Sequence, residues 1–509
     1  MPFIASRAQP RNNIPVRRKL YLETFGCQMN VLDSELVLGQ LRAQGYESVD
    51  HRDQADVILY NTCSVREHAE QKVWSRLGEL VDRKADDPGL IIGVIGCLAE
   101  RDGEQLLKRH PCVDILCGPG ELDRLPAMVH NATITGGPPQ RQVALLGRTG
   151  SRRSSTLAAA EDHLEMLDLS RSVSPADVSA QAYVRITRGC NKFCTYCVVP
   201  YTRGEEVHRP PQNIIDEVRR LTAAGAREIT LLGQTINHYA YRHGDGRVTS
   251  FADLLYRIHE ATPDLPRLRF VTSFPRDFTD EALDAMRDCP RICRYLHVPA
   301  QHGSDRILRL MNRGYAAGEY RDFVARARQK MPDICLASDF IVGFPTETDE
   351  EFQQTVDLLR ECRFKNSFIF KYSPRPGTTA MDRFTDDIPE TVKRKRNNEL
   401  LAAQQEICAE ENQKMVGRTV EVMVEGQSKL GSRRNGNGNG NGNHVELGWE
   451  KPAGVQLVGR TRGDQVVVFD GDATLIGSTL DVQIYDARSL TLFGRRAEGM
   501  LHRDTEAQR

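Results

Sequence analysis

The sequence predicts an α/β protein with three domains: a doubly wound parallel sheet, a partial (β/α)6 barrel and a small β-barrel at the C-terminal end. Three observations support this prediction. The 509 residues are enough for about three domains at roughly 100–200 residues each. Two separate stretches alternate apolar strand-like runs with helices of 3.6-residue period. A final stretch contains only short β patterns.

The N-terminal domain, expected over residues 18–146, has the alternation of strands and helices that is typical of a parallel sheet. Its strand-like runs lie at 19–26, 56–62, 90–96 and 113–118. The helical segments between them lie at 31–44, 65–80 and 99–110. Residues 1–17 are expected to form a disordered tail, and residues 147–180, which lose this periodicity, a linker.

A second alternating series occupies the domain expected over residues 181–413. Its six strand-like runs lie at 183–187, 228–233, 268–273, 295–299, 335–343 and 368–373. A closed barrel of this type has eight βα units, so six units predict a partial, open barrel. A long helix over 390–417 leaves this domain.

The last domain, expected over residues 414–496, contains five short strand-like runs at 419–426, 455–460, 465–470, 479–485 and 489–494. This pattern predicts a small β-barrel similar to OB-like nucleic-acid modules. The Asn-Gly insert at 435–443 is of low complexity and is expected to widen a loop, and residues 497–509 to form a tail.

Composition excludes several classes of protein. Lys and Arg number 68 against 69 for Asp and Glu, so the net charge of -1 excludes a globally basic nucleic-acid binder but permits local basic patches. The longest apolar run, at 89–99, is too short to span a bilayer, and the first residues contain no apolar signal core. We therefore expect a cytoplasmic protein without a membrane partner, whose thirteen cysteines bind metal, do redox work or pack in the core.

The strongest motif is Cys190-x3-Cys194-x2-Cys197, which follows the first strand of the predicted barrel, at the rim where barrel active sites assemble. Three thiolates on one loop suit a [4Fe-4S] cluster in which one iron lacks a protein ligand. That open iron can bind S-adenosylmethionine (SAM), which the cluster can then cleave by delivering an electron. The alternative is zinc, but structural zinc normally takes four ligands and no second cysteine pair is adjacent.

A second trio of cysteines emerges from the predicted topology. Cys27, Cys63 and Cys97 each stand at the C-terminal end of a predicted strand, immediately before a helix. Because strand ends in a doubly wound sheet converge on one edge, these thiols can meet there and hold a second cluster. Packing of three buried cysteines at strand ends is the alternative. The other seven are expected to be structural: Cys112, Cys117, Cys289, Cys293, Cys335, Cys362 and Cys408.

Six longer motifs make a resemblance to a known family specific. They occur in order as TFGCQMNVLDSE, NTCSVREHAEQK, GCNKFCTYCVVPYTRGEE, LLGQTIN, VPAQHGSDRILRLMNRGY and DFIVGFPTETDEEF. Over residues 17–496 the chain resembles the radical-SAM methylthiotransferase family, and its end resembles the RNA-binding TRAM domain of these enzymes. The resemblance implies two [4Fe-4S] clusters, a radical-SAM cluster on the loop trio and an auxiliary cluster on the strand-end trio.

The resemblance also implies an activity. The motifs resemble the branch of the family that converts isopentenyl-adenosine beside the tRNA anticodon into its 2-methylthio derivative with two SAM molecules. The alternatives are action on threonylcarbamoyl-adenosine in tRNA, action on an aspartate of a ribosomal protein and, from another class, an inactive iron–sulfur RNA-binding protein. The implied partners are the tRNA anticodon stem-loop, a sulfur donor and a reduced electron donor of flavodoxin or ferredoxin type. The protein itself is expected to be a monomer.

Candidate contacts to SAM and RNA complete the prediction. SAM is expected to lie across the barrel rim against residues at strand ends, namely Gly233, Gln234, Ser273, Gln301 and Gly343. Ordinary strand-end capping is the alternative for each of them. The candidates for phosphate contact are Lys393, Arg394, Lys395, Arg396, Arg460 and Arg462, although a helix that carries such a run more often presents a solvated face.

Aromatic side chains are the remaining candidates for contact with RNA. Tyr201 and Phe469 could each stack on a base, with core packing favoured for Phe469. The chain also departs from the family pattern at three positions: His208 and His302 stand where serine is usual, and Thr346 where glycine is common. None of these departures affects the six cluster cysteines.

Overall fold

The computed structural model describes residues 18–64, 67–134, 139–145, 164–171, 173, 178–428 and 455–497. The tail predicted over 1–17, most of the linker predicted over 147–180, the Asn-Gly insert and all but the first residue of the C-terminal tail lie outside the described residues. The chain divides into two compact units, Met1–Ser172 and Val173–Arg509. Among the described helices, none is both long enough and apolar enough to cross a membrane.

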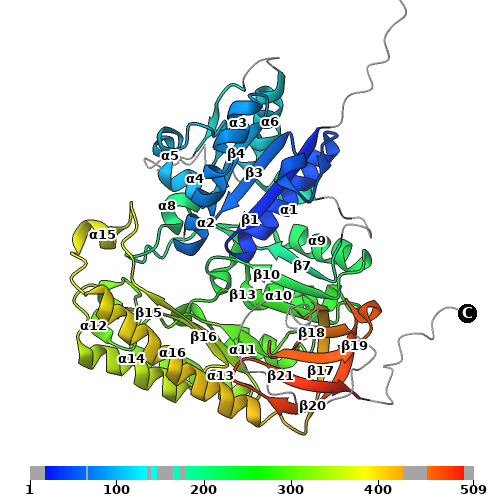
Figure 1. The fold of residues 1–509 in the computed structure, drawn as a ribbon. Helices are drawn as coiled ribbons and strands as arrows, with labels where there is room; N and C mark the ends of the chain where they lie inside the picture. The colour runs from blue at the N-terminus through cyan, green and yellow to red at the C-terminus, as the bar shows by residue number, and fades with distance from the viewer. Residues whose placement is uncertain are drawn as a thin grey trace, which may run out of the picture. The chain divides into compact units, whose positions relative to one another are not determined.

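The first unit is built on a six-stranded sheet in the order β2-β1-β3-β4-β5-β6, in which all neighbouring strands are parallel (Figure 1). The strands are β1 (Lys19–Phe25), β2 (Glu47–Ser48), β3 (Val57–Thr62), β4 (Ile91–Gly96), β5 (Ile115–Cys117) and β6 (Gln142–Ala144). The central strands β3 and β4 are buried along their whole length, as expected for strands covered on both faces. The predicted parallel sheet is confirmed.

The described helices of the first unit cover the three predicted helical segments and two further ones, 81–86 and 125–134, that the sequence did not indicate. They are α1 (Gln28–Ala43), α2 (Glu67–Gly78), α3 (Val81–Asp86), α4 (Cys97–Asp102), α5 (Glu104–Arg109) and α6 (Leu125–Ile134). The single helix predicted over 99–110 is two helices. Gly103 between them has a φ of +52°, and a residue in this left-handed region cannot continue a right-handed helix.

The second unit contains six parallel strands in chain order, split into two three-stranded sheets. One sheet is formed by β7 (Gln181–Arg185), β10 (Glu228–Leu232) and β13 (Arg267–Val271). The other is formed by β14 (Tyr295–His297), β15 (Cys335–Val342) and β16 (Asn366–Lys371). A parallel bridge between Leu268 and Ile292 joins them. This arrangement confirms the partial, open (β/α)6 barrel.

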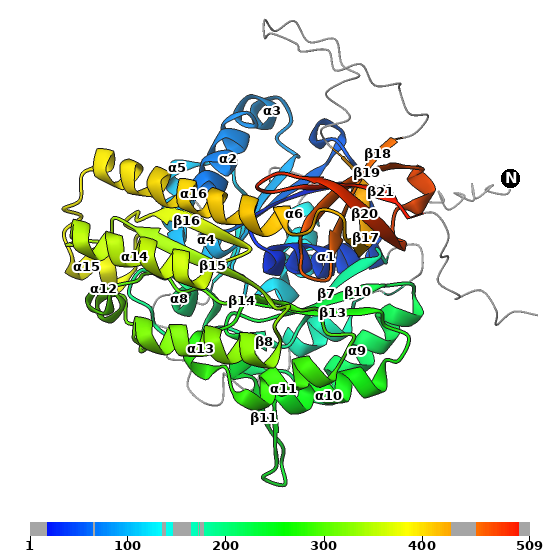
Figure 2. The ribbon, with the colours of Figure 1, turned by 90° about the horizontal axis from the view of Figure 1, so that it is seen from below.

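Helices cover the outside of this barrel, as Figure 1 shows. They are α9 (Pro211–Ala223), α10 (Phe251–Ala261), α11 (Asp280–Asp288), α12 (Asp305–Leu310), α13 (Ala317–Lys330) and α14 (Asp349–Cys362). The long α16 (Glu390–Gln413) lies along α14 and β16 and leads to the last domain (Figure 2). Three short elements shape the rim: the antiparallel pair β8 (Thr187–Arg188) and β9 (Val207–His208), and the 3-10 turn η3 (Ile236–His238).

The chain ends in a closed five-stranded barrel in the order β17-β18-β19-β21-β20. Its strands are β17 (Thr419–Gln427), β18 (Val455–Thr461), β19 (Val466–Gly471), β20 (Thr479–Ala487) and β21 (Leu492–Arg496). The interior is filled by apolar side chains that alternate along the strands, including Val422, Val424, Leu457, Phe469 and Ile484. The predicted small β-barrel is therefore confirmed.

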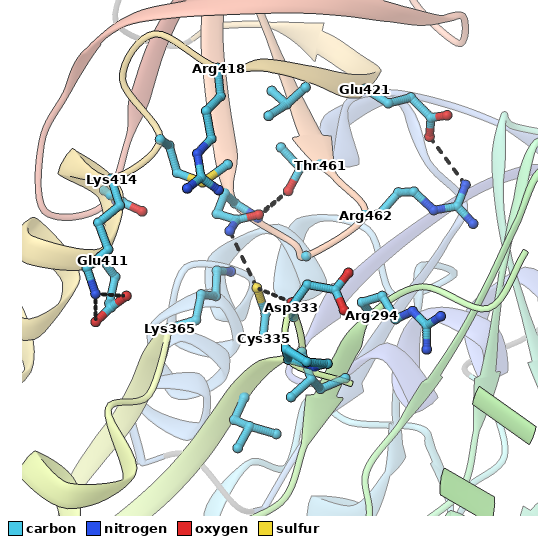
Figure 3. Close-up of a pocket in the computed structure, with 18 of the residues that line it drawn as sticks. Arg294, Asp333, Cys335, Lys365, Glu411, Lys414, Arg418, Glu421, Thr461 and Arg462 are labelled. Atoms are coloured by element: carbon cyan, nitrogen blue, oxygen red, sulfur yellow. Dashed lines mark hydrogen bonds and ion pairs between the residues drawn. The ribbon is translucent and has the colours of Figure 1, made fainter. Parts of the chain in front are cut away.

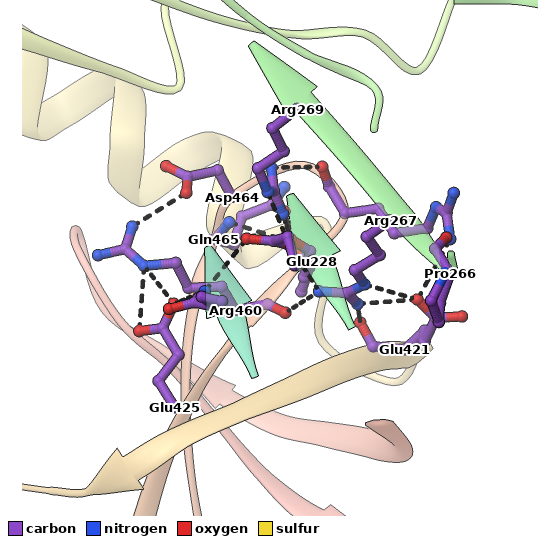
Figure 4. Close-up of polar contacts among 12 residues, drawn as sticks. Glu228, Pro266, Arg267, Arg269, Glu421, Glu425, Arg460, Asp464 and Gln465 are labelled. Atoms are coloured by element: carbon purple, nitrogen blue, oxygen red, sulfur yellow. Dashed lines mark hydrogen bonds and ion pairs between the residues drawn. The ribbon is translucent and has the colours of Figure 1, made fainter. Parts of the chain in front are cut away.

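A buried ionic contact joins this small barrel to the (β/α)6 barrel (Figure 4). The fully buried Arg267, at the start of β13, donates to the Glu421 carboxylate at 2.8 and 3.0 Å and to the Arg460 carbonyl at 2.9 Å. Arg269, two residues along the strand, donates to the Thr461 carbonyl at 2.7 Å. Both guanidinium groups also face the Glu228 carboxylate of β10, at 3.6 and 2.9 Å.

Replacing Arg267 by alanine would remove the fully buried cation that contacts the Glu421 carboxylate at 2.8 Å and faces that of Glu228 at 3.6 Å. Arg269 would remain beside Glu228, and the more distant Arg462 beside Glu421. We expect the apparent free energy of unfolding to fall by about 3–5 kcal/mol, measured by urea denaturation with circular dichroism. The matched control is Arg247→Ala, because Arg247 pairs with Asp245 at the surface, where its side chain is 80% exposed. The control should show no measurable loss, and equal losses in both variants would contradict a special role for the buried contact.

Candidate active-site rim and metal centres

The strand-end cysteines of the first unit lie at one edge of its sheet. Phe25, Thr62 and Gly96 form one row across β1, β3 and β4, and Cys27, Cys63 and Cys97 follow this row by one or two residues. Cys63 and Cys97 are buried, and Cys27 is half-buried. A Cβ atom on Gly26, whose φ is +131°, would lie 2.3 Å from the Cys63 Cβ. The turn between β1 and α1 therefore passes directly against Cys63, and only glycine fits there.

A buried amide network that the sequence reasoning missed stands behind these cysteines. Asn61 in β3 donates to the Asn30 carbonyl of α1 at 2.8 Å and to the Ser34 hydroxyl at 2.9 Å. Asn30 in turn donates to the Asn61 side-chain oxygen at 3.2 Å, and the Cys27 thiol lies 3.4 Å from the Asn30 oxygen. Both asparagines are fully buried. These contacts fix the start of α1, and hence Cys27, against the end of β3.

The loop cysteines of the second unit lie on a turn held from several sides. Gly189, with φ of +67°, lies very close to the backbone of Glu205. A Cβ atom added at Gly189 would lie 1.9 Å from the Glu205 carbonyl oxygen. The backbone N–H of Cys190 donates to Gly204 at 3.2 Å. On the other side, Thr195 is tied to the carbonyls of Leu310 and Met311 at 2.9 and 3.0 Å.

The chemistry of this loop trio fits a thiolate-bound metal cluster. Burial raises the pKa of Cys190, and it raises that of Cys197 to about 12, with a further contribution from the neighbouring Cys194. The charges of the three sulfurs therefore act on one another, and a thiolate here has little water to stabilise it. A metal that replaces the thiol protons would supply the missing positive charge. Three soft sulfur donors are the ligand set of iron–sulfur clusters.

Arg313 is a second feature that the sequence reasoning missed. Its buried guanidinium donates to the Cys194 sulfur at 3.4 Å and to the Pro299 carbonyl at 2.9 Å, and it stacks over the Phe274 ring at 4.5 Å. On the other side of the loop, the Thr235 hydroxyl lies 3.3 Å from the Cys190 sulfur. Arg313 stands within the motif VPAQHGSDRILRLMNRGY, but nothing local in sequence connects it to a cysteine 119 positions earlier.

The five residues predicted to contact SAM fall into two groups. Ser273 and Gln301 are buried, and the Ser273 hydroxyl and the Gln301 side-chain oxygen have no hydrogen-bond partner. Gly233 and Gly343, in contrast, are explained by packing: an added Cβ would lie 2.4 Å from the Thr187 hydroxyl and from the Lys393 side chain, respectively. Gln234 is half-buried beside Gly233. Contact with SAM remains a prediction for all five.

The predicted RNA-binding cations on α16 need a correction. Lys393 and Arg396 point into the protein, where Lys393 pairs with Asp386 at 2.6 Å and Arg396 pairs with Glu347 at 3.1 Å. The side chains of these two residues are therefore not on the surface for phosphate. Arg394 and Lys395 are exposed. The period of the helix explains the difference, because residues three apart share the buried face.

The remaining RNA candidates divide in the same way. Arg460 pairs with Glu425 and Asp464, each at 3.1 Å, and Arg462 pairs with Glu421 at 3.4 Å, all within the small barrel, while part of each side chain stays exposed. Both residues also touch the (β/α)6 barrel, Arg460 through its carbonyl to Arg267 and Arg462 through its guanidinium to the Pro266 carbonyl at 3.4 Å. Phe469 is buried in the small barrel, as expected from core packing. Tyr201 is exposed beside the exposed Phe193 of the cysteine loop, with ring centroids 6.4 Å apart.

A cavity of about 670 Å³ lies elsewhere in the second unit, between the small barrel and the starts of β14, β15 and β16 (Figure 3). Its walls carry several cations, including Arg294, Lys365 and Arg418, and the Cys335 sulfur accepts from Gln465 at 3.4 Å. Because these residues stand at the amino ends of the strands, the cavity is not part of the rim that carries the cysteine loop.

Three stretches of the chain match known families. Residues 19–118 match the family described as Uncharacterized protein family UPF0004, residues 184–359 match the Radical SAM superfamily, and residues 453–496 match the TRAM domain. Each match lies within one of the three predicted domains.

Whole-length relatives are also found. A Rhodopirellula baltica protein named tRNA-2-methylthio-N(6)-dimethylallyladenosine synthase is 46% identical over 482 residues, which cover 95% of this chain and 96% of that protein. A Porphyromonas gingivalis protein of the same name is 41% identical, with 94% of this chain and 95% of that protein covered. Among solved structures, the radical SAM methyltransferase TsrM from Kitasatospora setae is 15% identical with a TM-score of 0.48, over 72% of this chain and 77% of that one.

Replacing Arg313 by methionine would remove the cation and donor at the Cys194 sulfur while filling most of its volume. Hydrogen bonds and positive charge at cluster sulfurs favour the reduced state, so we expect the reduction potential of a cluster on this loop to become more negative. The measurement is a redox titration followed by electron paramagnetic resonance. The exposed Arg309→Met serves as control, and an unchanged potential in Arg313→Met would contradict this role.

Proposed function

This chain belongs to the family of tRNA-2-methylthio-N(6)-dimethylallyladenosine synthases, and on that premise we propose that it methylthiolates tRNA. The proposed reaction replaces the C–H bond at carbon 2 of an isopentenyl-adenosine beside the anticodon with C–S–CH3 and consumes two SAM molecules. The observation that carries the proposal is the placement of two cysteine trios in two matched domains, one at a sheet edge and one on a barrel rim.

The proposed cofactors follow from these trios. Radical SAM enzymes use a [4Fe-4S] cluster and SAM, and we propose that Cys190, Cys194 and Cys197 hold that cluster. We further propose a second [4Fe-4S] cluster on Cys27, Cys63 and Cys97. When bound, these groups supply the one-electron chemistry and the sulfur that an unactivated aromatic C–H bond requires.

The protein's own residues would position and shield the reactants. Arg313 and Thr235 hold two of the loop sulfurs in place, and the unpartnered polar atoms of Ser273 and Gln301 are suited to orient SAM. The exposed rings of Phe193, on the cysteine loop, and Tyr201, in the short helix Val199–Arg203 that follows it, offer a surface on which an unstacked base could pack. Such positioning is the main contribution that a protein makes to cofactor-driven radical chemistry.

The proposed macromolecular substrate is the anticodon stem-loop of a tRNA, bound in part by the TRAM domain. Arg394, Lys395, Arg460 and Arg462 remain candidates for phosphate contact because their side chains are at least partly exposed. We also propose a separate sulfur donor, a reduced electron donor of flavodoxin or ferredoxin type, a monomeric state and a cytoplasmic location.

Anaerobic reconstitution tests the two-cluster proposal. We expect about eight irons per chain, falling by about half when Cys190, Cys194 and Cys197 are all replaced by alanine, and likewise for Cys27, Cys63 and Cys97. Gly26→Ala should also lower the iron content because its Cβ would displace Cys63. Gly45→Ala is the matched control, since Gly45 also has positive φ but no atom within 4 Å of an added Cβ. Four irons in the parent protein would refute the second cluster.

Mass spectrometry of tRNA nucleosides from a strain that lacks the gene tests the substrate. We expect 2-methylthio-isopentenyl-adenosine to disappear, to return with the parent gene and to stay absent with the triple Cys190/Cys194/Cys197 variant. Unchanged levels in the deletion strain would refute the assignment. Loss of methylthio-threonylcarbamoyl-adenosine or of the ribosomal-protein modification instead would select one of the other members of the family, and no loss of any of them would favour an inactive RNA-binding protein.

A further inference from the structure

Three side chains outside both cysteine trios converge at the rim of the (β/α)6 barrel. Glu206 and His208 come from the β9 segment, and His238 is the last residue of η3. One ligand atom from each lies within 4.8 Å of the others. The Glu206 side chain is 2% exposed, that of His208 18% and that of His238 45%, so the group is anchored inside the protein and open to solvent on one side.

The hydrogen bonds of this group are incomplete in a specific way. The Glu206 Oε2 atom lies 2.8 Å from the His238 Nδ1, but Oε1 lies 3.6 Å from the His208 Nε2, which is too long for a hydrogen bond. The Glu206 Oε1 and the His208 Nε2 are both buried without a hydrogen-bond partner. A buried carboxylate oxygen and a buried ring nitrogen thus face each other with a gap between them.

The other nitrogen of His208 accounts for its orientation. Nδ1 lies 2.9 Å from the Ala240 carbonyl oxygen and 3.1 Å from the Ala240 backbone nitrogen, whose N–H donates to it in the other tautomer. In the tautomer that donates to the carbonyl, the lone pair on Nε2 points toward Glu206, and this is the form that can ligate a metal. Two lone pairs that face each other are unfavourable unless a cation lies between them. A histidine that ligates a metal typically donates its other ring N–H to a carbonyl in this manner.

We propose that Glu206, His208 and His238 bind a divalent cation of the zinc class, with a fourth position open to water. Two imidazoles and one carboxylate form a ligand set that suits zinc, and three protein ligands leave one coordination position free.

The charges around the site are compatible with a bound cation. Burial alone would raise the pKa of Glu206, but the two imidazoles hold it below its usual value, so the carboxylate is ionised. Lys192 is a cation that acts on His238, and its charge is paired with Asp277. The competing state is a cation-free cluster in which protons on the imidazoles neutralise Glu206.

The position of the site points to a structural role for the metal. In the segment that leads to Glu206, the Gly204 carbonyl accepts a hydrogen bond from the Cys190 backbone N–H. The backbone N–H of Glu206 itself donates to the Asn191 side-chain oxygen at 3.1 Å. The segment that leads to His238 contacts the Cys190 sulfur through Thr235. A metal bound by Glu206 and His238 would therefore hold together the two segments that contact Cys190.

Metal analysis of the iron-loaded protein tests this proposal. The protein is reconstituted with iron and sulfide, incubated with one equivalent of zinc chloride, passed through a desalting column and analysed for zinc and iron. We expect about one zinc per chain in the parent after desalting. His208→Ser and Glu206→Gln should retain clearly less zinc, because loss of a ligand weakens zinc affinity by at least about tenfold. His243→Ala is the matched control, because His243 bonds the Thr249 hydroxyl on the neighbouring hairpin and lies outside the group.

X-ray absorption at the zinc edge separates this site from binding to cysteine. Nitrogen and oxygen ligands at about 2.0–2.1 Å are expected, whereas sulfur ligands at about 2.3 Å would overturn the proposal. It would equally be overturned if the parent retained no zinc, or if both variants retained as much as the parent at equal iron content. Because the readout is metal content, the result does not depend on tRNA methylthiolation, and a failure of either proposal leaves the other standing.

Discussion

The direction of parallel strands is the constraint on which both cysteine centres depend. In the first unit, the register of β1, β3 and β4 places the ends of three strands in one row, so residues about 35 positions apart in sequence become neighbours. In the second unit, the end of β7 delivers the cysteine loop to the rim where the other strands also end. The chemistry is concentrated at strand ends because only there does backbone leave the sheet without losing ladder hydrogen bonds.

Around the loop trio, the surrounding residues would stabilise the charge that the sulfurs acquire when they bind the proposed cluster. Burial keeps the thiols of Cys190 and Cys197 protonated in the free chain, while the fully buried contacts of Arg313 keep a positive charge beside Cys194. Binding of the proposed cluster would therefore release protons. The same guanidinium also bonds the Pro299 carbonyl, so the rim and the loop are fixed together.

The strands and the six cysteines could be predicted because apolar periodicity and position at a strand end are both local properties of the sequence. The role of Lys393 and Arg396 could not, since a run of four cations does not show which side of a helix meets Glu347 and Asp386. Gly233 and Gly343 were predicted at the rim, but the atoms that require glycine there belong to Thr187 and Lys393, which are distant in sequence. Arg313 and Asn61 were missed for the same reason: their partners are brought near only by the fold.

The contact of Arg267 and Arg269 with the small barrel has a consequence for how such proteins can change over time. Three of its acceptors, the Glu421 carboxylate and the carbonyls of Arg460 and Thr461, belong to β17 and β18. Its two cations stand near the start of a strand of the other barrel. A terminal domain transplanted from an unrelated enzyme would arrive without a matching carboxylate and would strand two charges in the interior. We therefore expect another small β-barrel to replace this one without loss of stability only if it brings a carboxylate to the position of Glu421.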